Sequence, residues 1–434
     1  MAIEHFIMFW EKLTAIGGYI MADSLKVWLV KEGEALPTDE GQQRLLRMGL
    51  IGEEFDKVGA NIMWFASTFD HNLKKFRVDH TVELPVNDHY SVCLLHGRNY
   101  TKNLSLGRIL HFADERKQFG TLAETKEKPD VIVAAMPNID LALAAVKYGK
   151  KHNVPVFVDV RDMWPELYED YFPKFKKLVH YAIIPFKKQL SWTLKNATGI
   201  FGTSEKFLGW ALGYAGREKG PNDNFYYVSY PDTNVELTDE DLKYWYDMGL
   251  SEDDTICCFF GQFGHAVNLE PVMYAALETA KKNPKIKYVI CGMGEKLETY
   301  KQILNGADNV IFPGWVDRKQ ICALGKISSI GLLSYRKNKN FEWSMPNKFC
   351  EYLALGLAVV VEPTGMMADL AAEHQIGFRY DDEHQLAEKL LYLADHRDEI
   401  PDMKKRAREL YEQQFKADVV YGRMVSDIRR IIGK

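Results

Sequence analysis

The stretch Thr255-Ile-Cys-Cys-Phe-Phe-Gly-Gln-Phe-Gly264 has the pattern of a buried strand followed by a glycine-containing turn. Its apolar run is short and lacks polar alternation, which is typical of a parallel strand covered by helices on both faces. Gly261 and Gly264 precede a stretch with helical periodicity, so the backbone there can approach a phosphate or a sugar closely. A tight strand-to-helix turn is the alternative interpretation of this glycine pair.

The same alternation of short apolar runs and longer helical stretches occurs in both halves of the chain. It predicts an α/β fold with two Rossmann-like, doubly wound domains that face each other across a cleft. Strands are expected in the first half at residues 25–30, 60–66, 91–95, 130–135, 154–160, 199–202 and 226–229, and in the second half at residues 255–260, 287–291, 309–312, 329–333, 358–361 and 377–380.

A domain boundary is expected at residues 230–236, where Pro231, Asp232 and Asn234 interrupt the apolar pattern. The chain of 434 residues is long enough for two cores of ordinary size. The expected organisation is an N-terminal extension of residues 1–24 that can form an amphipathic helix, a Rossmann-like domain of residues 25–232, a second of residues 233–415, and a C-terminal helix of residues 416–434 that crosses back to the first domain.

Composition narrows the class of protein. Hydrophobic residues make up 47% and charged residues 26% of the chain, which excludes a disordered or fibrous protein, and a net charge of -5 gives no support to nucleic-acid binding. The six cysteines form no CxxC pair and are expected to be reduced core residues. No apolar stretch approaches the roughly 20 residues of a membrane span, and residues 1–24 lack the features of a signal peptide. We therefore expect a cytoplasmic protein.

Three further segments carry a family resemblance. They are Val158-Asp-Val-Arg-Asp-Met-Trp-Pro-Glu166, Cys291-Gly-Met-Gly-Glu295 together with the 261–264 turn, and Pro346-Asn-Lys-Phe-Cys-Glu-Tyr-Leu-Ala-Leu-Gly356. Together they resemble the family 4 retaining glycosyltransferases of the GT-B fold, in particular enzymes of bacterial surface-polysaccharide synthesis. The resemblance implies sugar transfer from a nucleotide-diphosphate sugar, expected to be UDP-linked, to a lipid-linked or saccharide acceptor, with the donor in the C-terminal domain and the acceptor in the N-terminal one.

The donor site is expected around Lys348 and Glu351. A break at residues 344–346 before a helical pattern would point free backbone N–H groups at phosphates, and Lys348 adds a positive charge that can act in catalysis. Glu351 lies three residues on and can accept hydrogen bonds from the ribose hydroxyls, the role that the resemblance also implies. An ordinary surface pair is the alternative. The candidate donor-binding residues are Gly261, Gln262, Gly264, His265, Gly292, Gly294, Val316, Ser344, Pro346, Asn347, Lys348 and Glu351.

Acidic and basic residues of the first domain are candidates for the acceptor. Asp162 is a candidate catalytic residue just beyond a strand end, with Arg161 and Glu166 as acceptor-binding residues; a structural pair of Arg161 with Asp162 is the alternative. Glu34 and Asp39, in the loop after the first strand, are candidates for the catalytic base and for acceptor binding.

The chain departs from the family pattern in two places. Gln262, His265 and Asn268 stand where family members carry an arginine and a lysine on the diphosphate, so Lys348, with Arg336 or Lys337, is expected to supply the charge. The first glutamate of the Glu-x7-Glu motif is replaced by Trp343, preceded by Glu342. Either residue is a candidate for contact with the donor sugar.

Residues 175–194 predict a basic amphipathic stretch that Pro185 kinks. Such a stretch can lie on anionic lipid, and a core-facing helix with a solvated lysine face is the alternative. Together with the aromatic N-terminus around Trp10 and the basic residues Arg98, Lys102 and Arg108, it favours a polyprenyl-diphosphate-linked acceptor at the inner face of the plasma membrane. The apolar arc is Phe175, Leu178, Val179, Ala182, Ile183, Phe186 and Leu190, opposite Lys174, Lys177, Lys187 and Lys188.

No metal and no cofactor beyond the nucleotide sugar is expected, because no Asp-x-Asp pair is flanked by apolar strand residues and Lys348 can supply the counter-charge. Two alternative functions stay open. A nucleotide-sugar epimerase on the same fold would turn over the donor alone. A non-catalytic partner subunit of another transferase would bind the nucleotide sugar without transferring it.

Overall fold

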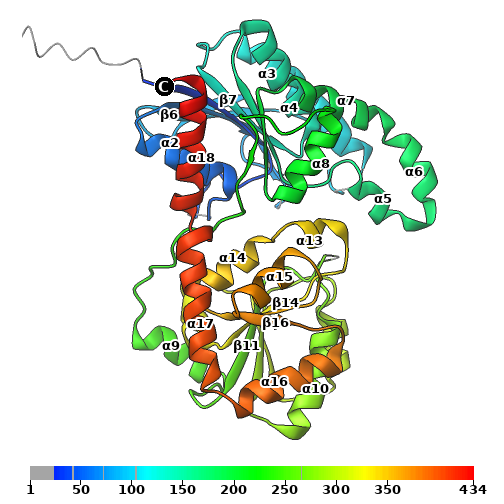
Figure 1. The fold of residues 1–434 in the computed structure, drawn as a ribbon, viewed down its shortest axis with the longest axis vertical. Helices are drawn as coiled ribbons and strands as arrows, with labels where there is room; N and C mark the ends of the chain where they lie inside the picture. Colours follow the sequence, from blue (N-terminus) through cyan, green and yellow to red (C-terminus); the bar gives the residue numbers. More distant parts are fainter. Residues whose placement is uncertain (1–23, 42–43, 72, 103–104, 265) are drawn as a thin grey trace, which may run out of the picture. The chain divides into compact units, whose positions relative to one another are not determined.

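The computed structural model describes residues 24–41, 44–71, 73–102, 105–264 and 266–434. The described chain contains two mainly parallel sheets with helices packed on them (Figure 1), which confirms the predicted α/β class with doubly wound, Rossmann-like sheets. It divides into two compact units: residues up to Ala134 with residues 144–156 and 430–434, and residues 135–143 with residues 157–429. The predicted boundary at residues 230–236 lies inside the second unit.

The N-terminal sheet has the strand order β10-β9-β8-β7-β1-β2-β6-β5, and only β5 is antiparallel to its neighbour. Leu29 of β1 lies opposite Trp64 of β2 and Val133 of β7. The strands are β1 (Lys26–Val30), β2 (Asn61–Ser67), β5 (Val82–Pro85), β6 (Tyr90–Leu95), β7 (Val131–Met136), β8 (Val156–Val160), β9 (Gly199–Gly202) and β10 (Asn224–Phe225), and β3 (Phe69–Asp70) with β4 (Lys75–Phe76) form a separate short pair.

Eight helices accompany these strands within the described ranges. Their bounds are α2 (Arg47–Lys57), α3 (Leu106–Ala123), α4 (Ile139–His152), α5 (Leu167–Tyr171), η1 (Pro173–Phe175), α6 (Lys176–Ala182), α7 (Ile184–Asn196) and α8 (Glu205–Ala215). The predicted 175–194 helix is therefore two helices. Pro185 lies in the first turn of α7, where a missing N–H costs no helical hydrogen bond, so it begins a helix rather than kinking one.

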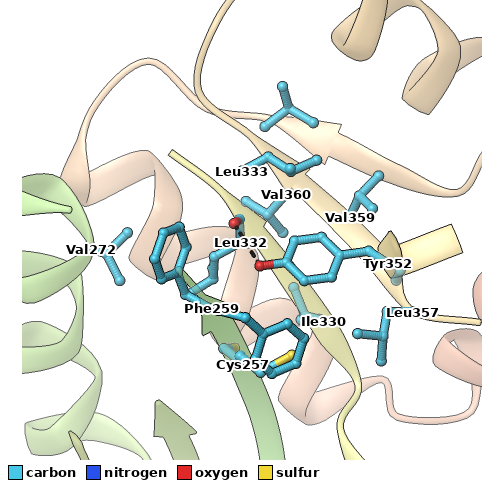
Figure 2. Packing of buried hydrophobic residues seen from close by; sticks show 14 of the residues in the cluster. Cys257, Phe259, Val272, Ile330, Leu332, Leu333, Tyr352, Leu357, Val359 and Val360 are labelled. Carbon is cyan, nitrogen blue, oxygen red and sulfur yellow. Dashed lines mark hydrogen bonds between the residues drawn. The ribbon is translucent and has the colours of Figure 1, made fainter. Parts of the chain in front are cut away.

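The second sheet is fully parallel, with the order β13-β12-β11-β14-β15-β16. Figure 2 shows its core, in which Tyr352 reaches over β14 and donates a hydrogen bond to the carbonyl oxygen of Leu332 at 3.3 Å. Gly331 is required there, because a Cβ would lie 2.4 Å from the Tyr352 ring. The strands are β11 (Thr255–Phe260), β12 (Ile286–Cys291), β13 (Val310–Gly314), β14 (Ile330–Leu333), β15 (Ala358–Val361) and β16 (Gly377–Arg379).

The helices around the second sheet include α14, which carries the candidate donor residues. They are α9 (Asp239–Tyr246), α10 (Glu270–Lys282), α11 (Leu297–Leu304), α12 (Arg318–Ile327), α13 (Lys339–Trp343), α14 (Asn347–Ala354), α15 (Met366–Glu373), α16 (Glu383–Asp395), α17 (Glu399–Leu410) and the π-turn η2 (Tyr411–Phe415). The last helix, α18 (Ala417–Ile432), packs against residues 224–229. No helix in these or the other described ranges has the length and apolarity that a membrane span needs.

Twelve of the predicted strands lie within two residues of observed ones, and one prediction was wrong. Residues 226–229 are not a strand; the strand is the preceding Asn224–Phe225. The apolar residues there pack instead against the C-terminal helix α18: the Tyr226 hydroxyl donates to Asp427 at 2.8 Å, and the Ser229 N–H donates to the Tyr421 hydroxyl at 3.1 Å. All six cysteines lie in the described ranges, are buried, and form no disulfide.

Candidate active site

The candidate donor residues gather at the point where the strand order of the second sheet reverses. Strands β12 and β13 lie on one side of β11, whereas β14, β15 and β16 lie on the other. Loops that leave adjacent parallel strands in opposite directions open a crevice at the carboxyl end of the sheet, where ligands bind in doubly wound folds. The loops after β11 and β14 flank this crevice.

Two glycines shape the loops at this edge. Gly261 has φ +144° and Gly292 has φ +131°, values that residues with a Cβ rarely adopt. The Gly261 N–H donates to the Cys291 carbonyl at 2.9 Å, and the Gly292 N–H donates to the Gly314 carbonyl at 2.7 Å. A Cβ on Gly292 would lie 1.8 Å from the Gly261 carbonyl oxygen. The glycines are thus required by the close approach of the two loops.

Lys348 extends to this glycine loop. Helix α13 ends at Trp343, Ser344 is extended, and α14 begins after its N-cap Pro346, so Lys348 lies in the first turn of α14. A Cβ on Gly261 would lie 2.5 Å from the Lys348 ammonium nitrogen, and this nitrogen lies 5.5 Å from the centre of the Phe259 ring. Two segments that lie 87 residues apart in the sequence therefore place a cation beside open backbone at the switch point.

Glu351 lies one turn further along α14 and is buried, with 8% of its surface exposed. Its Oε1 accepts a hydrogen bond from the Tyr230 hydroxyl at 2.6 Å. This burial does not fit the alternative of an ordinary surface pair. A buried carboxylate needs hydrogen-bond donors, and Tyr230 supplies one while the second oxygen of the carboxylate has further acceptor capacity.

Comparison with known proteins identifies this part of the chain. The family model described as glycosyl transferases group 1 matches residues 247–410. This part of the second sheet and its helices is therefore similar to a group 1 glycosyltransferase domain. No protein in a search of curated sequences matches the chain significantly.

Solved structures with a similar fold support a GT-B fold for the chain. Sucrose-phosphate synthase from Thermosynechococcus elongatus has 14% identity and a TM-score of 0.69, over 94% of this chain and 99% of that one. HepE from Anabaena, solved with UDP-glucose, has 13% identity and a TM-score of 0.64, over 94% of this chain and 100% of that one. Trehalose 6-phosphate synthase from Burkholderia multivorans has 13% identity and a TM-score of 0.65, over 94% of this chain and 99% of that one. None of these three is described as an epimerase.

The remaining candidate donor residues surround the same edge of the glycosyltransferase domain. Gln262 is exposed, and Val316 is buried behind the exposed Trp315. A Cβ on Gly294 would lie 2.7 Å from the Phe263 carbonyl oxygen, so this glycine shapes the loop after β12. Asn347 begins α14. His265 lies outside the described residues.

Of the candidates for the missing family charges, Lys337 has an acidic partner, and Arg336 is bonded through its backbone. Lys337 Nζ lies 3.9 Å from Asp381, and the Arg336 N–H donates to the Ala266 carbonyl at 3.0 Å. Asn268 donates to Glu362 at 2.8 Å, and burial raises the pKa of this carboxyl. The sequence analysis did not find Glu362, because nothing local marks it.

Glu342 and Trp343, the candidates for contact with the donor sugar, lie at the end of α13. The Glu342 carboxylate accepts a hydrogen bond from the Thr364 hydroxyl at 3.2 Å, and Gly365, with φ +94°, packs against the backbone of Glu342. The ring of Trp343 lies 5.7 Å from the Lys339 ammonium nitrogen. Glu342 thus lies near the loop after β15.

Arg161 has a carboxylate partner at the end of β8. Arg161 Nε donates to the fully buried Asp159 at 2.7 Å. Asp162 accepts from the Asn340 amide at 3.3 Å, and Glu166 accepts from the Tyr214 hydroxyl. Arg161 pairs with Asp159 because both side chains lie on the same face at the end of β8, two residues apart.

Glu34 and Asp39 hold the loop after β1 together. Glu34 accepts from the Met48 N–H at 3.0 Å, at the start of α2. Asp39 accepts from Arg77 Nη2 at 2.8 Å and from the Leu36 N–H at 2.9 Å. Both carboxylates therefore have structural partners, and their roles toward an acceptor stay predictions.

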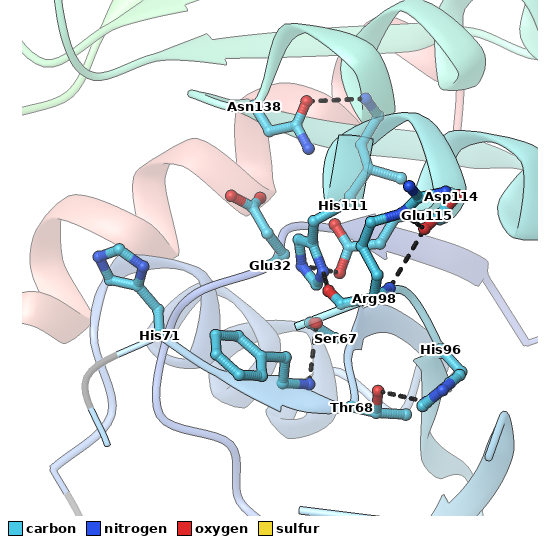
Figure 3. Close-up of polar contacts among 12 residues, drawn as sticks. Glu32, Ser67, Thr68, His71, His96, Arg98, His111, Asp114, Glu115 and Asn138 are labelled. Carbon is cyan, nitrogen blue, oxygen red and sulfur yellow. Dashed lines mark hydrogen bonds and ion pairs between the residues drawn. The ribbon is translucent and has the colours of Figure 1, made fainter. Parts of the chain in front are cut away.

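A polar cluster that the sequence analysis missed lies beside this loop (Figure 3). Within it His111 Nε2 lies 3.0 Å from the fully buried Glu115, and His111 Nδ1 lies 2.6 Å from the Arg98 carbonyl oxygen. Burial opposes a charge on His111, but the hydrogen bond and the charge of Glu115 outweigh it and raise the pKa of His111. Burial also raises the pKa of Glu115. His111 and Glu115 lie one turn apart on α3, and the fold brings the Arg98 carbonyl to them.

No group of three or more His, Cys, Asp or Glu side chains that could hold a metal ion occurs in the part of the chain that the structure describes.

Proposed function

We propose that this glycosyltransferase is a retaining enzyme of family 4 that takes a sugar from a UDP-sugar and transfers it to a lipid-linked or saccharide acceptor. The observation that carries the proposal is the position of Lys348 against Gly261 at the topological switch point, with Glu351 buried one turn along the same helix. HepE, which has a similar fold, was solved with UDP-glucose, and this supports a UDP-linked donor.

In the proposed reaction the acceptor hydroxyl forms a new bond to C1 of the sugar while the bond between C1 and the diphosphate oxygen breaks. The hydroxyl proton passes to the departing diphosphate, on which negative charge grows. Lys348 and the N–H groups of the α14 first turn would stabilise that charge, because they are already in place and need no reorganisation. Glu351 would fix the nucleotide by accepting hydrogen bonds from the ribose. This scheme takes its counter-charge from the protein.

An exposed surface on α5, η1 and α6 supports a membrane-bound acceptor. We name it the α6 patch, and it consists of Tyr171, Phe172, Phe175, Leu178 and Tyr181. Of these, Phe175 is 62%, Leu178 69% and Tyr181 71% exposed. The neighbouring Lys174, Lys176 and Lys177 are also exposed. Aromatic and apolar side chains beside lysines complement an anionic lipid surface.

The two halves of the amphipathic arc predicted for residues 175–194 differ in exposure, and each half agrees with a different interpretation. Its first part, on α6, is exposed as the lipid-binding interpretation requires. Ile183 and Leu190, further along, are buried as the core-facing interpretation requires. We place the proposed enzyme at the inner face of the plasma membrane in polysaccharide assembly, with the α6 patch toward lipid.

The proposal is tested first by thermal denaturation of the purified protein with UDP, GDP, ADP, CMP or dTDP. A ligand at a hundred times its dissociation constant stabilises by about 2.7 kcal/mol, which raises the melting temperature by roughly a few degrees. We expect a shift with UDP alone. Sugar consumption that requires an acceptor would support transfer, whereas donor turnover without an acceptor would indicate an epimerase, and binding without turnover a partner subunit. Absence of any nucleotide shift would refute the donor site.

A further inference from the structure

Three cationic side chains from separate loops surround two aromatic ones at the carboxyl edge of the N-terminal sheet. Lys31 follows β1, Lys74 lies between β3 and β4, and Arg108 lies in the first turn of α3. We name these three residues, with His71 and Tyr100, the Tyr100 cluster. Loops at this edge of a parallel sheet are the ones that bind ligands in doubly wound folds.

The Tyr100 hydroxyl is the centre of the Tyr100 cluster. It lies 2.6 Å from His71 Nδ1, and Arg108 donates a hydrogen bond to it. The Lys74 ammonium nitrogen lies 3.3 Å from His71 Nδ1 and 4.8 Å from the centre of the Tyr100 ring. The guanidinium carbon of Arg108 lies 5.9 Å from the same ring. Lysine and arginine thus converge on one small region.

The electrostatic potential in the Tyr100 cluster favours the binding of an anion. Burial, together with Arg108, Lys74 and Lys31, lowers the pKa of His71 to about 4, whereas Asp70 acts in the opposite direction. The Asp70 carboxylate also forms an ion pair with Arg77, whose Nη2 lies 3.4 Å from Asp70 Oδ2. The Glu32 carboxylate pairs with Lys31, with 3.3 Å between Oε2 and Nζ. His71 is therefore neutral at neutral pH and accepts a hydrogen bond through Nδ1, which leaves the positive charge of the lysines and the arginine dominant.

Burial in the Tyr100 cluster also suits a charged ligand. Lys31 is buried, whereas Lys74 and Arg108 are half-buried and so keep access to solvent. Charges in such partly desolvated positions interact more strongly than on an open surface. Burial raises the pKa of Tyr100 to about 12, so its hydroxyl stays protonated, and its one proton is directed at the neutral His71. The arginine and the lysine beside it are the side chains that match the oxygens of a phosphoryl group.

We propose that the Tyr100 cluster binds a phosphoryl group of the acceptor substrate. The assignment to the acceptor rests on the proposed function, but the binding of the anion does not. A sugar phosphate and a lipid-linked phosphate or diphosphate share this chemistry.

The test is calorimetric titration of the full-length protein with inorganic pyrophosphate, with UDP present at saturation to occupy the donor site. We expect pyrophosphate to bind, and Arg108→Gln and Lys74→Gln each to weaken it by tenfold or more. The matched control is Lys117→Gln, on the same helix as Arg108 but outside the Tyr100 cluster, which should change the affinity by less than twofold. Equal affinity in all four proteins, or no binding in the wild type, would overturn the proposal.

A second measurement uses only the wild type, so its result does not depend on whether the variants fold. Nuclear magnetic resonance titration of the histidine C–H signals should show pyrophosphate raising the pKa of His71, because a bound anion offsets the neighbouring cations. An unchanged His71 pKa at saturating pyrophosphate would contradict the proposal.

The source of the phosphoryl group is distinguished by competition against pyrophosphate. Displacement at lower concentration by glucose 6-phosphate would indicate a sugar-phosphate acceptor, and displacement by farnesyl diphosphate a lipid-linked one. If neither displaces bound pyrophosphate, the assignment to the acceptor is wrong. Failure of the donor proposal is recognised separately, by the absence of UDP binding in a titration without pyrophosphate.

Discussion

Replacing Glu351 by glutamine tests the donor site with little change of shape. The carboxylate is almost completely buried, and its Oε1 already accepts a hydrogen bond from Tyr230 at 2.6 Å. Glutamine keeps an acceptor for Tyr230, so the fold should be retained. It removes the negative charge that would strengthen hydrogen bonds from the two ribose hydroxyls of the nucleotide.

The size of the effect follows from those two hydrogen bonds. A hydrogen bond to a charged group contributes about 1.5–3 kcal/mol, and one between neutral groups about 0.5–1.5 kcal/mol. Loss of the charge therefore weakens two bonds by roughly 2–3 kcal/mol in total, which corresponds to an increase of about 30- to 150-fold in the Kd of UDP. The assay is calorimetric titration of UDP into the wild type and Glu351→Gln, with melting temperatures measured alongside.

Tyr230→Phe is the matched control, because it removes the structural hydrogen bond and leaves the charge. We expect it to lower stability by about 1–3 kcal/mol through loss of a buried bond, while the Kd of UDP changes less than threefold. A UDP Kd within threefold of wild type for Glu351→Gln would refute the ribose role of Glu351.

Three further predictions concern other parts of the chain. The double variant Phe175→Glu and Leu178→Glu should reduce flotation with phosphatidylglycerol-containing vesicles at least tenfold, because each substitution removes apolar area and adds a charge like that of the lipid, whereas Tyr274→Glu, at another exposed aromatic residue, should not. Gly292→Ala should lower the free energy of unfolding in urea by about 2–4 kcal/mol, since its Cβ would meet the Gly261 carbonyl. The control Gly264→Ala, whose Cβ would meet nothing within 4 Å, should leave stability almost unchanged, and similar denaturation midpoints for the two variants would show that the loop relaxes freely. The wild type should lose stability relative to His71→Gln as pH falls from about 6.5 to about 4, because the unfolded chain binds a proton at His71 in that range and the folded chain does not; parallel stability curves for the two proteins would contradict this.

The strands could be predicted from the sequence because a parallel strand buried on both faces must be apolar throughout. Thr255–Phe260 and Ala358–Val361 lie at their predicted positions for this reason. The antiparallel edge strand Val82–Pro85 was missed because half of it faces solvent and Glu83 interrupts the apolar pattern. The strand predicted at residues 226–229 failed because apolar residues that pack on a helix look the same in sequence as those of a strand.

The candidate donor residues could be named in part from local spacing. Lys348 and Glu351 are three residues apart, so a helix places them near one another whatever surrounds it. Nothing in their neighbourhood indicates that Tyr230, 121 residues earlier, donates to Glu351, or that Gly261 lies under the Lys348 ammonium. No sequence pattern predicted the Tyr100 cluster either, because its members come from several segments and no spacing rule connects them.

The sequence by itself determined the class of fold, the buried parallel strands and the helix that carries Lys348 and Glu351, since these depend on periodicity and on neighbours a few residues away. The partners of the charged side chains were decided only by the tertiary structure. Arg161 binds Asp159, Asp39 binds Arg77, and Lys74 and Arg108 converge on Tyr100. The physical reason is that a buried charge must find its partner in space, and the strand order of a sheet, which the pattern of apolar residues does not encode, decides which loops meet.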